Sequence, residues 1–241
     1  MNDARIGTAG WSISRTSAHR FPREGTGLER YAAVFNAVEI NSSFHRPHRR
    51  STWERWRDSV PDAFRFSLKI PKWITHEAKL ADCDEALGVF LDDAGVLGEK
   101  LAVLLVQLPP KLEFDPAVAK RFFTSLAARS SGVIACEPRH ATWFDGEADR
   151  LLRELRVARV AADPARHAGA GEPGGWRGLS YWRLHGSPVI YRSSYGDRIR
   201  GYAKALQAAA TGGGETWCVF DNTASSAATH DAIALKDELA H

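Results

Sequence analysis

Cysteine is scarce in this chain, and the three cysteines, Cys83, Cys136 and Cys218, lie far apart. An odd number of cysteines without a CxxC pair predicts neither a disulfide framework nor a cysteine-rich zinc site. Long apolar runs are also missing, since the longest have about six residues and a bilayer span needs ~20. The segment Met1–Arg5 leads straight into a strand-like run and lacks an apolar signal region. We therefore expect a cytoplasmic protein with reduced thiols and no membrane partner.

Several motifs for cofactors and nucleophiles are absent as well. No GxGxxG directly follows a strand-like run and opens a helix, no GxxxxGK[ST] occurs, and Gly7 with Gly10 is too weak a pattern alone. A GxSxG nucleophile elbow is not found either. The sequence thus predicts no nucleotide cofactor.

A large excess of charge of either sign is also lacking. Lysine and arginine number 32 against 29 aspartates and glutamates, a net charge of +3. This mild surplus favours the approach of an anionic ligand but falls short of the basic excess of many nucleic-acid binders. The 44% of apolar residues argues against disorder.

Short apolar, β-prone runs recur along the 241 residues, and segments with helical spacing separate most of them. Leu101–Val106 is continuously apolar, as in a parallel strand buried on both faces. Asp115-Pro116 and Ser51 have the residue types that start helices, and a last helix is expected over Ser226–Leu239. The predicted strands are Arg5–Thr8, Ala37–Ile40, Arg65–Leu68, Ala102–Val106, Val133–Cys136, Arg159–Ala162, Ser180–Leu184 and Thr216–Phe220.

This alternation predicts an α/β fold, a single (β/α)₈ TIM-type barrel domain over residues 1–241. An open doubly wound sheet is the alternative. One connection breaks the rhythm: Pro164–Gly178 is rich in glycine, and we expect a long, irregular and mobile loop between the sixth and seventh strands.

Polar side chains follow every predicted strand, where the active site of such a barrel lies. Burying such charges without partners costs several kcal/mol each, so we expect them to converge at one rim. The candidate residues are Trp11, Glu39, Asn41, Lys69, His76, Gln107, Glu137, Arg139, His140, Asp163, Arg183, His185 and Asn222.

Carboxylates with imidazoles are the groups of general acid–base catalysis, so Glu39, Glu137, His140 and His185 are the predicted catalytic residues. The other nine candidates are assigned to substrate binding, because arginine and lysine suit a phosphate or carboxylate. We hypothesise a hydrolase or lyase acting on a phosphorylated or otherwise anionic substrate. The alternatives are a nucleic-acid phosphodiesterase of endonuclease type, a non-catalytic protein that binds an anionic metabolite, and a barrel that mainly assembles with a partner.

Structural interpretations remain open beside the functional ones. Glu39, Lys69, Glu137 and Arg183 could form an ion-pair ring that only closes the barrel, Asp163 and Asp221 could be helix caps, and Trp11 could anchor a loop. For His76, His140 and His185 both interpretations are equally open. A divalent metal could be bound by residues that lack any HxH or HxxxH spacing; these residues are Glu39, Glu137, Asp163, His185 and Asp221.

Several segments also resemble one known family in the same order along nearly the whole chain. Ile6–Trp11 is similar to the opening motif of the YecE-like family, a domain of unknown function, and Val38–Arg46 to its second-strand signature. Glu137-Pro138-Arg139-His140 with Trp143 resembles its E-x-R-H-x-x-W run, and Tyr181–Gly186 and Phe220–Thr223 its last two signatures. The resemblance implies a TIM barrel and no settled activity. Asp221 stands where many relatives carry Asn, so it is not counted among the site residues.

Overall fold

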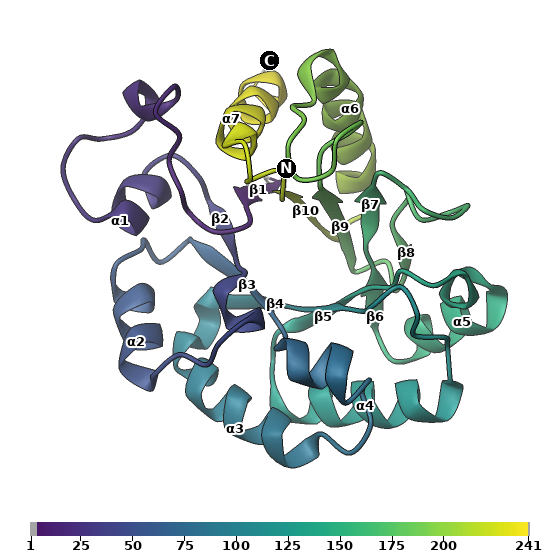
Figure 1. Ribbon diagram of the computed structural model, residues 1–241. Coiled ribbons are helices and arrows are strands. Elements are labelled where there is room, and N and C mark those ends of the chain that lie inside the picture. Colours follow the sequence, from purple (N-terminus) through teal and green to yellow (C-terminus); the bar gives the residue numbers. More distant parts are fainter. Residues whose placement is uncertain (1–3, 241) are drawn as a thin grey trace.

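The computed structural model describes residues 4–240, so Met1–Asp3 and His241 lie outside the described residues. Parallel strands form an inner wall, and helices surround it on the outside (Figure 1). The strands are β1 (Arg5–Thr8), β2 (Ala37–Ile40), β3 (Arg65–Lys69), β4 (Leu101–Gln107), β5 (Val133–Glu137), β6 (Val157–Arg159), β7 (Ala161–Asp163), β8 (Gly174–Gly175), β9 (Leu179–Leu184) and β10 (Glu215–Phe220).

The helices follow the strands as the alternation predicted. Asp115 caps α4 through its side chain, which accepts from the backbone N–H groups of Ala117 and Val118, whereas α2 begins one residue before Ser51. The helices are α1 (Gly27–Ala32), α2 (Arg50–Asp58), α3 (Asp84–Ala94), α4 (Pro116–Arg129), α5 (Gly146–Glu154), α6 (Ile199–Ala210) and α7 (Ala227–Leu239), with the short helices η1 (Ala18–Arg20), η2 (Ser42–Phe44), η3 (Trp73–Glu77), η4 (Gly95–Lys100), η5 (Ala141–Phe144) and η6 (Gly196–Arg198). None of the helices within residues 4–240 is long and apolar enough to cross a membrane.

The wall closes into a barrel through two seams. Parallel pairing runs β2-β3-β4-β5-β6 in one sheet and β7-β9-β10-β1 in the other. At the first seam the predicted strand Arg159–Ala162 is wrong in its bounds: it starts at Val157 and is interrupted at Val160, where the chain changes its neighbour from β5 to β9. At the second seam a parallel bridge joins Ala9 to Glu39.

The glycine-rich connection between β7 and β9 contains a short strand of its own. Gly174 and Gly175 form β8, which pairs antiparallel with Ala158 and Arg159 of β6. A side chain on Gly174 would run into the guanidinium of Arg159. The connection is therefore joined to the edge of β6 at the first seam, and its mobility stays a prediction.

The inside of the barrel is a core of its own. Side chains alternate between the two faces of a strand, and a buried apolar cluster separate from the main core contains Ala37, Ala135, Tyr181 and Val219. Two residues further along each of these strands the inward position carries a charge. The site described next is this last inward layer, which consists of Glu39, Lys69, Glu137, Arg183 and Asp221.

Candidate functional site

Arg183 of β9 lies at the centre of the charged layer and is completely buried. It donates to both oxygens of Glu39, from Nε to Oε2 at 2.9 Å and from Nη2 to Oε1 at 2.7 Å. It also donates to Glu137 through Nη1 and to Asp221 through Nη2, the latter at 3.0 Å. Three carboxylates from different strands therefore share one guanidinium, which raises the pKa of Arg183 well above its usual value despite the opposing effect of burial.

His185 joins two of these carboxylates. Its Nδ1 lies 3.0 Å from Oδ2 of Asp221, and its Nε2 lies 3.2 Å from Oε1 of Glu137. Burial alone lowers the pKa of His185, but the charge of Glu137 and the hydrogen bonds outweigh it and raise the pKa above 6.5. With a carboxylate at each ring nitrogen, the geometry favours the doubly protonated imidazolium.

The two carboxylates respond in the opposite direction. Burial alone raises the pKa of Glu137, but Arg183, His185 and Arg139 outweigh it and hold the pKa well below 4.5. For Asp221 burial is likewise outweighed by Arg183 and His185, and its pKa is lowered. Both side chains are thus held as carboxylates in the interior.

Hydroxyl groups of Tyr181 and Ser67 lie on the side of Glu39 that faces the apolar interior of the barrel. The phenol of Tyr181 donates to Oε2 of Glu39 at 3.1 Å, and its oxygen lies 2.9 Å from Oγ of Ser67, whose hydroxyl can donate to it. Tyr181 lies two residues before Arg183 on β9 and so faces the same way. The position of Glu39 is therefore fixed by Arg183 on one side and Tyr181 on the other.

Lys69 differs from every other charged group of this layer. Its side chain is only 6% exposed, yet within residues 4–240 it forms no hydrogen bond and no ion pair, and its Nζ lies 4.1 Å from the ring centre of Phe44. Burial and the charge of Arg183 lower the pKa of Lys69 to about 8, although Glu39, Asp221 and Glu137 act against them.

The charges in the described part of this layer do not cancel. Three carboxylates, Glu39, Glu137 and Asp221, pair with Arg183, His185 and Arg139. Lys69 is the cation left over when these pairs are formed. With His185 protonated, the four cations Lys69, Arg139, Arg183 and His185 outnumber the three carboxylates by one, and Lys69 is the cation that forms none of the ion pairs.

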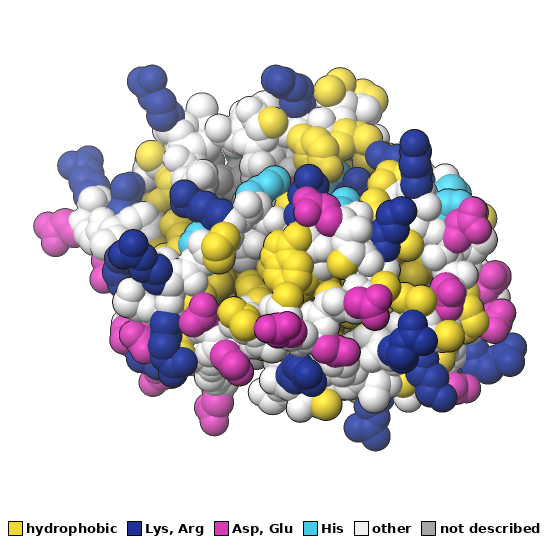
Figure 2. Space-filling model, turned by 60° about the horizontal axis from the view of Figure 1, so that its bottom comes forward, with side chains coloured by type: hydrophobic (Ala, Val, Ile, Leu, Met, Phe, Trp, Pro, Cys, Tyr) yellow, Lys and Arg dark blue, Asp and Glu magenta, His cyan; other side chains and the backbone are white. Residues whose placement is uncertain are grey.

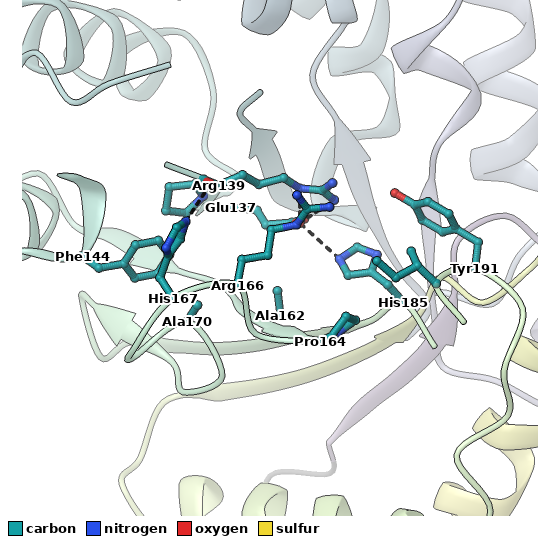
Figure 3. Close-up of a pocket in the computed structure, with 12 residues that line it drawn as sticks. Glu137, Arg139, Phe144, Ala162, Pro164, Arg166, His167, Ala170, His185 and Tyr191 are labelled. Atoms are coloured by element: carbon teal, nitrogen blue, oxygen red, sulfur yellow. Dashed lines mark hydrogen bonds and ion pairs between the residues drawn. The ribbon is translucent and has the colours of Figure 1, made fainter. Parts of the chain in front are cut away.

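A small pocket opens beside this layer (Figure 3). Glu137, Arg139, His185 and Tyr191 lie on one side of it, and Phe144 with His167 closes the other. Arg139 donates to Oε1 of Glu137 from Nη2 at 3.0 Å, and Tyr191 stands edge-on to His185 with ring centres 5.8 Å apart. The cavity volume is about 20 Å³, which is room for a water molecule and not for a substrate. A ligand that enters from this side therefore has to displace some of the residues that line the pocket.

Other predicted site residues are engaged in local structure. His140 caps η5, because its Nδ1 lies 3.0 Å from Oγ1 of Thr142 and accepts from the backbone N–H of the same residue. Trp11 packs edge-on against Trp56 of α2, with ring centres 5.0 Å apart. Neither side chain forms a described contact with the charged layer, so the roles predicted for both stay predictions.

The polar residues at the ends of the remaining strands lie around the layer. Asp163 accepts from Nη2 of Arg198 at 2.8 Å. Asn222 donates to Asp231 and to the carbonyl of Ser193. Three buried side-chain oxygens have no hydrogen-bond partner among residues 4–240: one each of Asn41, Asp163 and Asn222.

Gln107 and His76 complete the predicted set. Gln107 is buried and donates to the carbonyl of Leu108 at the long distance of 3.4 Å. The pKa of His76 is lowered by burial and then by the charges of Lys69, Arg139 and Lys72. His76 is therefore a neutral imidazole close to the leftover cation.

Three residues of the site were missed from the sequence. Asp221 was set aside because relatives carry Asn there, yet it bonds both Arg183 and His185. Tyr181 could have been found from its position two residues before Arg183, which puts both on one face. Nothing in the sequence pointed to Tyr191, because it belongs to the irregular segment after β9.

The residues considered for a metal do not fit one. Within residues 4–240, no three His, Cys, Asp or Glu side chains are grouped so as to hold a metal ion. The reason is visible in the geometry: Arg183 occupies the space between Glu39, Glu137 and Asp221, and Asp163 is paired with Arg198 instead. The guanidinium neutralises the carboxylates that a cation would need.

Fold and site together define an α/β barrel with a charged, partly closed site at the carboxyl ends of its strands. The chain belongs to the family described as "Protein of unknown function DUF72", whose model matches residues 5–241. This confirms the YecE-like resemblance. The UPF0759 protein YecE of Escherichia coli K12 is 37% identical over 146 residues, which are 57% of this chain. The match spans about half (52%) of that relative's length.

Solved structures of the family share the fold over almost the full chain. A DUF72 family protein from Enterococcus faecalis V583 has a TM-score of 0.85 at 19% identity, covering 99% of this chain and 96% of its own. A DUF72 family protein from Thermotoga maritima MSB8 has a TM-score of 0.76 at 22% identity and covers 99% of both chains. These identities establish the fold alone.

The same fold occurs in more distant proteins. A D-allulose 3-epimerase from Methylomonas sp. has a TM-score of 0.54 at 14% identity, over 100% of this chain and 96% of its own. A fusion protein with a xylose isomerase-like TIM barrel has a TM-score of 0.53 at 13% identity, with 98% of this chain matching 42% of that one. The fold is thus that of xylose isomerase-like TIM barrels and is shared with enzymes.

Proposed function

We propose that the mouth of the barrel binds a small anionic substrate, phosphorylated or carrying another anionic group, and acts on it as a hydrolase or lyase by acid–base chemistry. The observation that carries the proposal is Lys69, a residue that is only 6% exposed and whose ammonium group forms no hydrogen bond and no ion pair within residues 4–240. A buried cation without a partner is costly, and an anionic group of a ligand would neutralise it.

Arg139 is the second group that we assign to the substrate. Its guanidinium borders the pocket, donates to one oxygen of Glu137 and lies beside the phenol of Tyr191, and we assign the remaining N–H groups of its fork to a phosphate or carboxylate. Arg183 has a different role in this proposal. Because three carboxylates enclose it, it fixes their positions and does not grip the ligand.

Glu137 and His185 supply the acid–base chemistry. His185 is the acid, because its imidazole carries the proton that a substrate at this edge of the pocket takes up. Glu137, which lies 3.2 Å from Nε2 of His185, is the base of this hydrogen-bonded pair. Asp221 holds the imidazole in place from the other nitrogen. Glu39, paired with Arg183 and Tyr181, is further from this path.

The test is binding of inorganic phosphate and of sulfate, measured as a rise in the melting temperature and by calorimetric titration. The parent protein is expected to bind, and Lys69→Met to bind at least tenfold more weakly, because about 1.4 kcal/mol of charge–charge attraction corresponds to that factor. Lys72→Met is the matched control, since Lys72 is exposed and paired with Glu77. Equal phosphate binding by the parent protein and Lys69→Met would refute the proposal.

A non-catalytic binding protein is the second candidate, and one observation favours it. Both ring nitrogens of His185 are already hydrogen-bonded, to Asp221 and to Glu137. A site that only binds an anion by its charge also needs its charged groups fixed in this way. The enzyme and the binding protein are distinguished by an assay of phosphate release from phosphate esters, carried out with the parent protein and with His185→Gln. Loss of release with phosphate binding retained indicates an enzyme, whereas binding by the parent protein without release from any ester indicates a binding protein.

Nucleic-acid processing is not favoured by the surface that can be seen. Figure 2 shows lysine and arginine side chains interspersed with aspartate and glutamate over the face that it presents. A continuous basic stripe is the usual footprint for a polyanion. The carboxylates that a metal-dependent phosphodiesterase needs are also held by Arg183.

A further inference from the structure

Lys69 stands apart from the other lysine that is largely buried. The ammonium of Lys100 donates to the carbonyls of Arg57 and Val60 at 2.9 and 2.7 Å. Lys69, which is more deeply buried, has no acceptor within residues 4–240, and its Nζ lies over the ring of Phe44, 4.1 Å from the ring centre. The nitrogen of Lys69 is therefore available to bond to a ligand at the carboxyl ends of the strands.

We propose that Nζ of Lys69 is a nucleophile that forms an imine with the carbonyl carbon of a small anionic aldehyde or ketone. The inference rests on the proposed function and narrows it to the lyase class. Three features of the geometry support it: Lys69 is the last inward residue of β3, Arg183 lies in the same layer, and the acid and base groups of the site surround that layer.

The surroundings of Lys69 raise the fraction of neutral amine, which is the reactive form, although the ammonium still predominates at pH 7. Burial removes water from the ammonium, and Arg183 adds a like charge nearby. A pKa of about 8 leaves roughly a tenth of the amine unprotonated at pH 7, compared with well under one in a thousand for an ordinary lysine.

The protons of the reaction can be balanced with groups of the site. The nitrogen lone pair attacks the carbonyl carbon, the carbonyl oxygen takes up a proton, and the resulting hydroxyl leaves as water after a second protonation. His76, a neutral imidazole whose pKa is lowered by the charge of Lys69, accepts the proton that the amine loses and passes it to the carbonyl oxygen. His185 supplies the proton for the departing water.

Once the nitrogen of Lys69 is bonded to the carbonyl carbon, Arg139, the second group assigned to the substrate, holds its anionic group. The charges of Lys69 and Arg139 both lower the pKa of the His76 imidazole, and we assign both cations to one small molecule. A carbonyl at Lys69 and a carboxylate or phosphate at Arg139 define the substrate class as a short-chain oxo acid or a phosphorylated aldehyde or ketone. In the protonated imine the bond between the two carbons next to the former carbonyl carbon breaks, and its electron pair forms an enamine. The hydroxyl group on the departing carbon loses its proton, so that this part leaves as a second carbonyl compound. The enamine takes up a proton at carbon, and water then hydrolyses the imine and returns the amine.

The experiment uses glyoxylate, a small anionic aldehyde, with sodium cyanoborohydride to trap imines, and peptide mapping to locate the labelled lysines. At pH 7 we expect Lys69 to be labelled on the order of tenfold faster than Lys72, because more of its amine is neutral. Inorganic phosphate should slow labelling of Lys69 and leave Lys72 unchanged. Labelling of Lys69 that is no faster than that of Lys72 overturns the inference.

Failure of the imine and failure of the proposed function are distinguishable. If Lys69 is not labelled preferentially but phosphate still binds in a Lys69-dependent manner, the imine is wrong and the anion site stands. If phosphate binding does not depend on Lys69, both are wrong. Lys69→Arg, which keeps the charge, should retain most phosphate binding and abolish the labelled peptide, and its circular dichroism and melting curve check that it is folded.

Discussion

Arg183 and Glu39 form a two-pronged ion pair inside the barrel, with N–O distances of 2.9 and 2.7 Å, and neither side chain is exposed to solvent. The pair joins β9 to β2 across the interior, and both strands lie in different sheets of the wall. Removing either member leaves the other as a charge buried without its partner, which lowers the free energy of unfolding.

Glu39→Gln is therefore expected to destabilise the protein by about 3–5 kcal/mol, the usual cost of removing one member of a buried pair. The measurement is the free energy of unfolding from denaturant titration. Arg183→Met should cost at least as much, since it leaves three carboxylates together.

The control for this prediction is an exposed pair of similar geometry. Arg20 contacts both oxygens of Asp237, and the two side chains are 45% and 50% exposed. Asp237→Asn should cost less than about 1 kcal/mol. A Glu39→Gln variant as stable as Asp237→Asn would show that the interior network contributes nothing to folding.

His185 predicts a dependence of stability on pH. Its pKa is raised in the folded protein, so its contribution is present in full below the ordinary histidine pKa near 6.5. That contribution is lost as the pH rises through the raised value, because the folded state binds the proton more tightly than the unfolded state. The free energy of unfolding of the parent minus that of His185→Gln should therefore shrink above pH 6.5.

Taking the difference in the free energy of unfolding between the parent protein and His185→Gln removes the contributions of titratable groups that are the same in both proteins. His48 and His76 have lowered pKa values and change stability in the opposite direction, but they are present in both proteins. A difference that stays constant from pH 6 to pH 9, a range chosen around the histidine pKa, would contradict the imidazolium assignment.

The capping contact of His140 predicts that two substitutions of this residue differ in their effect on stability. Its ring caps η5, so His140→Ala should cost about 0.5–2 kcal/mol of stability and His140→Asn, whose side chain can also cap, much less. Phosphate binding should be the same in both variants. A tenfold loss of phosphate binding in His140→Asn would instead restore the role in the site that the sequence suggested.

The sequence predicted most of the barrel because its strands are buried on both faces and read as continuous apolar runs. It also predicted Glu39, Glu137 and Arg183, since each follows such a run and the carboxyl ends of parallel strands meet. The break at Val160 was not predictable, because it depends on which neighbours the strand pairs with on either side of the seam. The capping by His140 and the contact of Trp11 with a helix depend on loop geometry that no periodicity encodes.

Gly7 tests the closure of the barrel between β1 and β2. A methyl group at this position would lie 2.2 Å from the carbonyl oxygen of Ala37, which is backbone and cannot turn away. Gly7→Ala is therefore expected to destabilise the protein by about 1–3 kcal/mol or more. Gly201→Ala is the matched control, because that exposed position in α6 has nothing within 4 Å of the added carbon and should gain about 0.4–1 kcal/mol. Denaturant unfolding of the two variants should thus shift in opposite directions, and an equal shift would mean that β1 and β2 are not packed this closely.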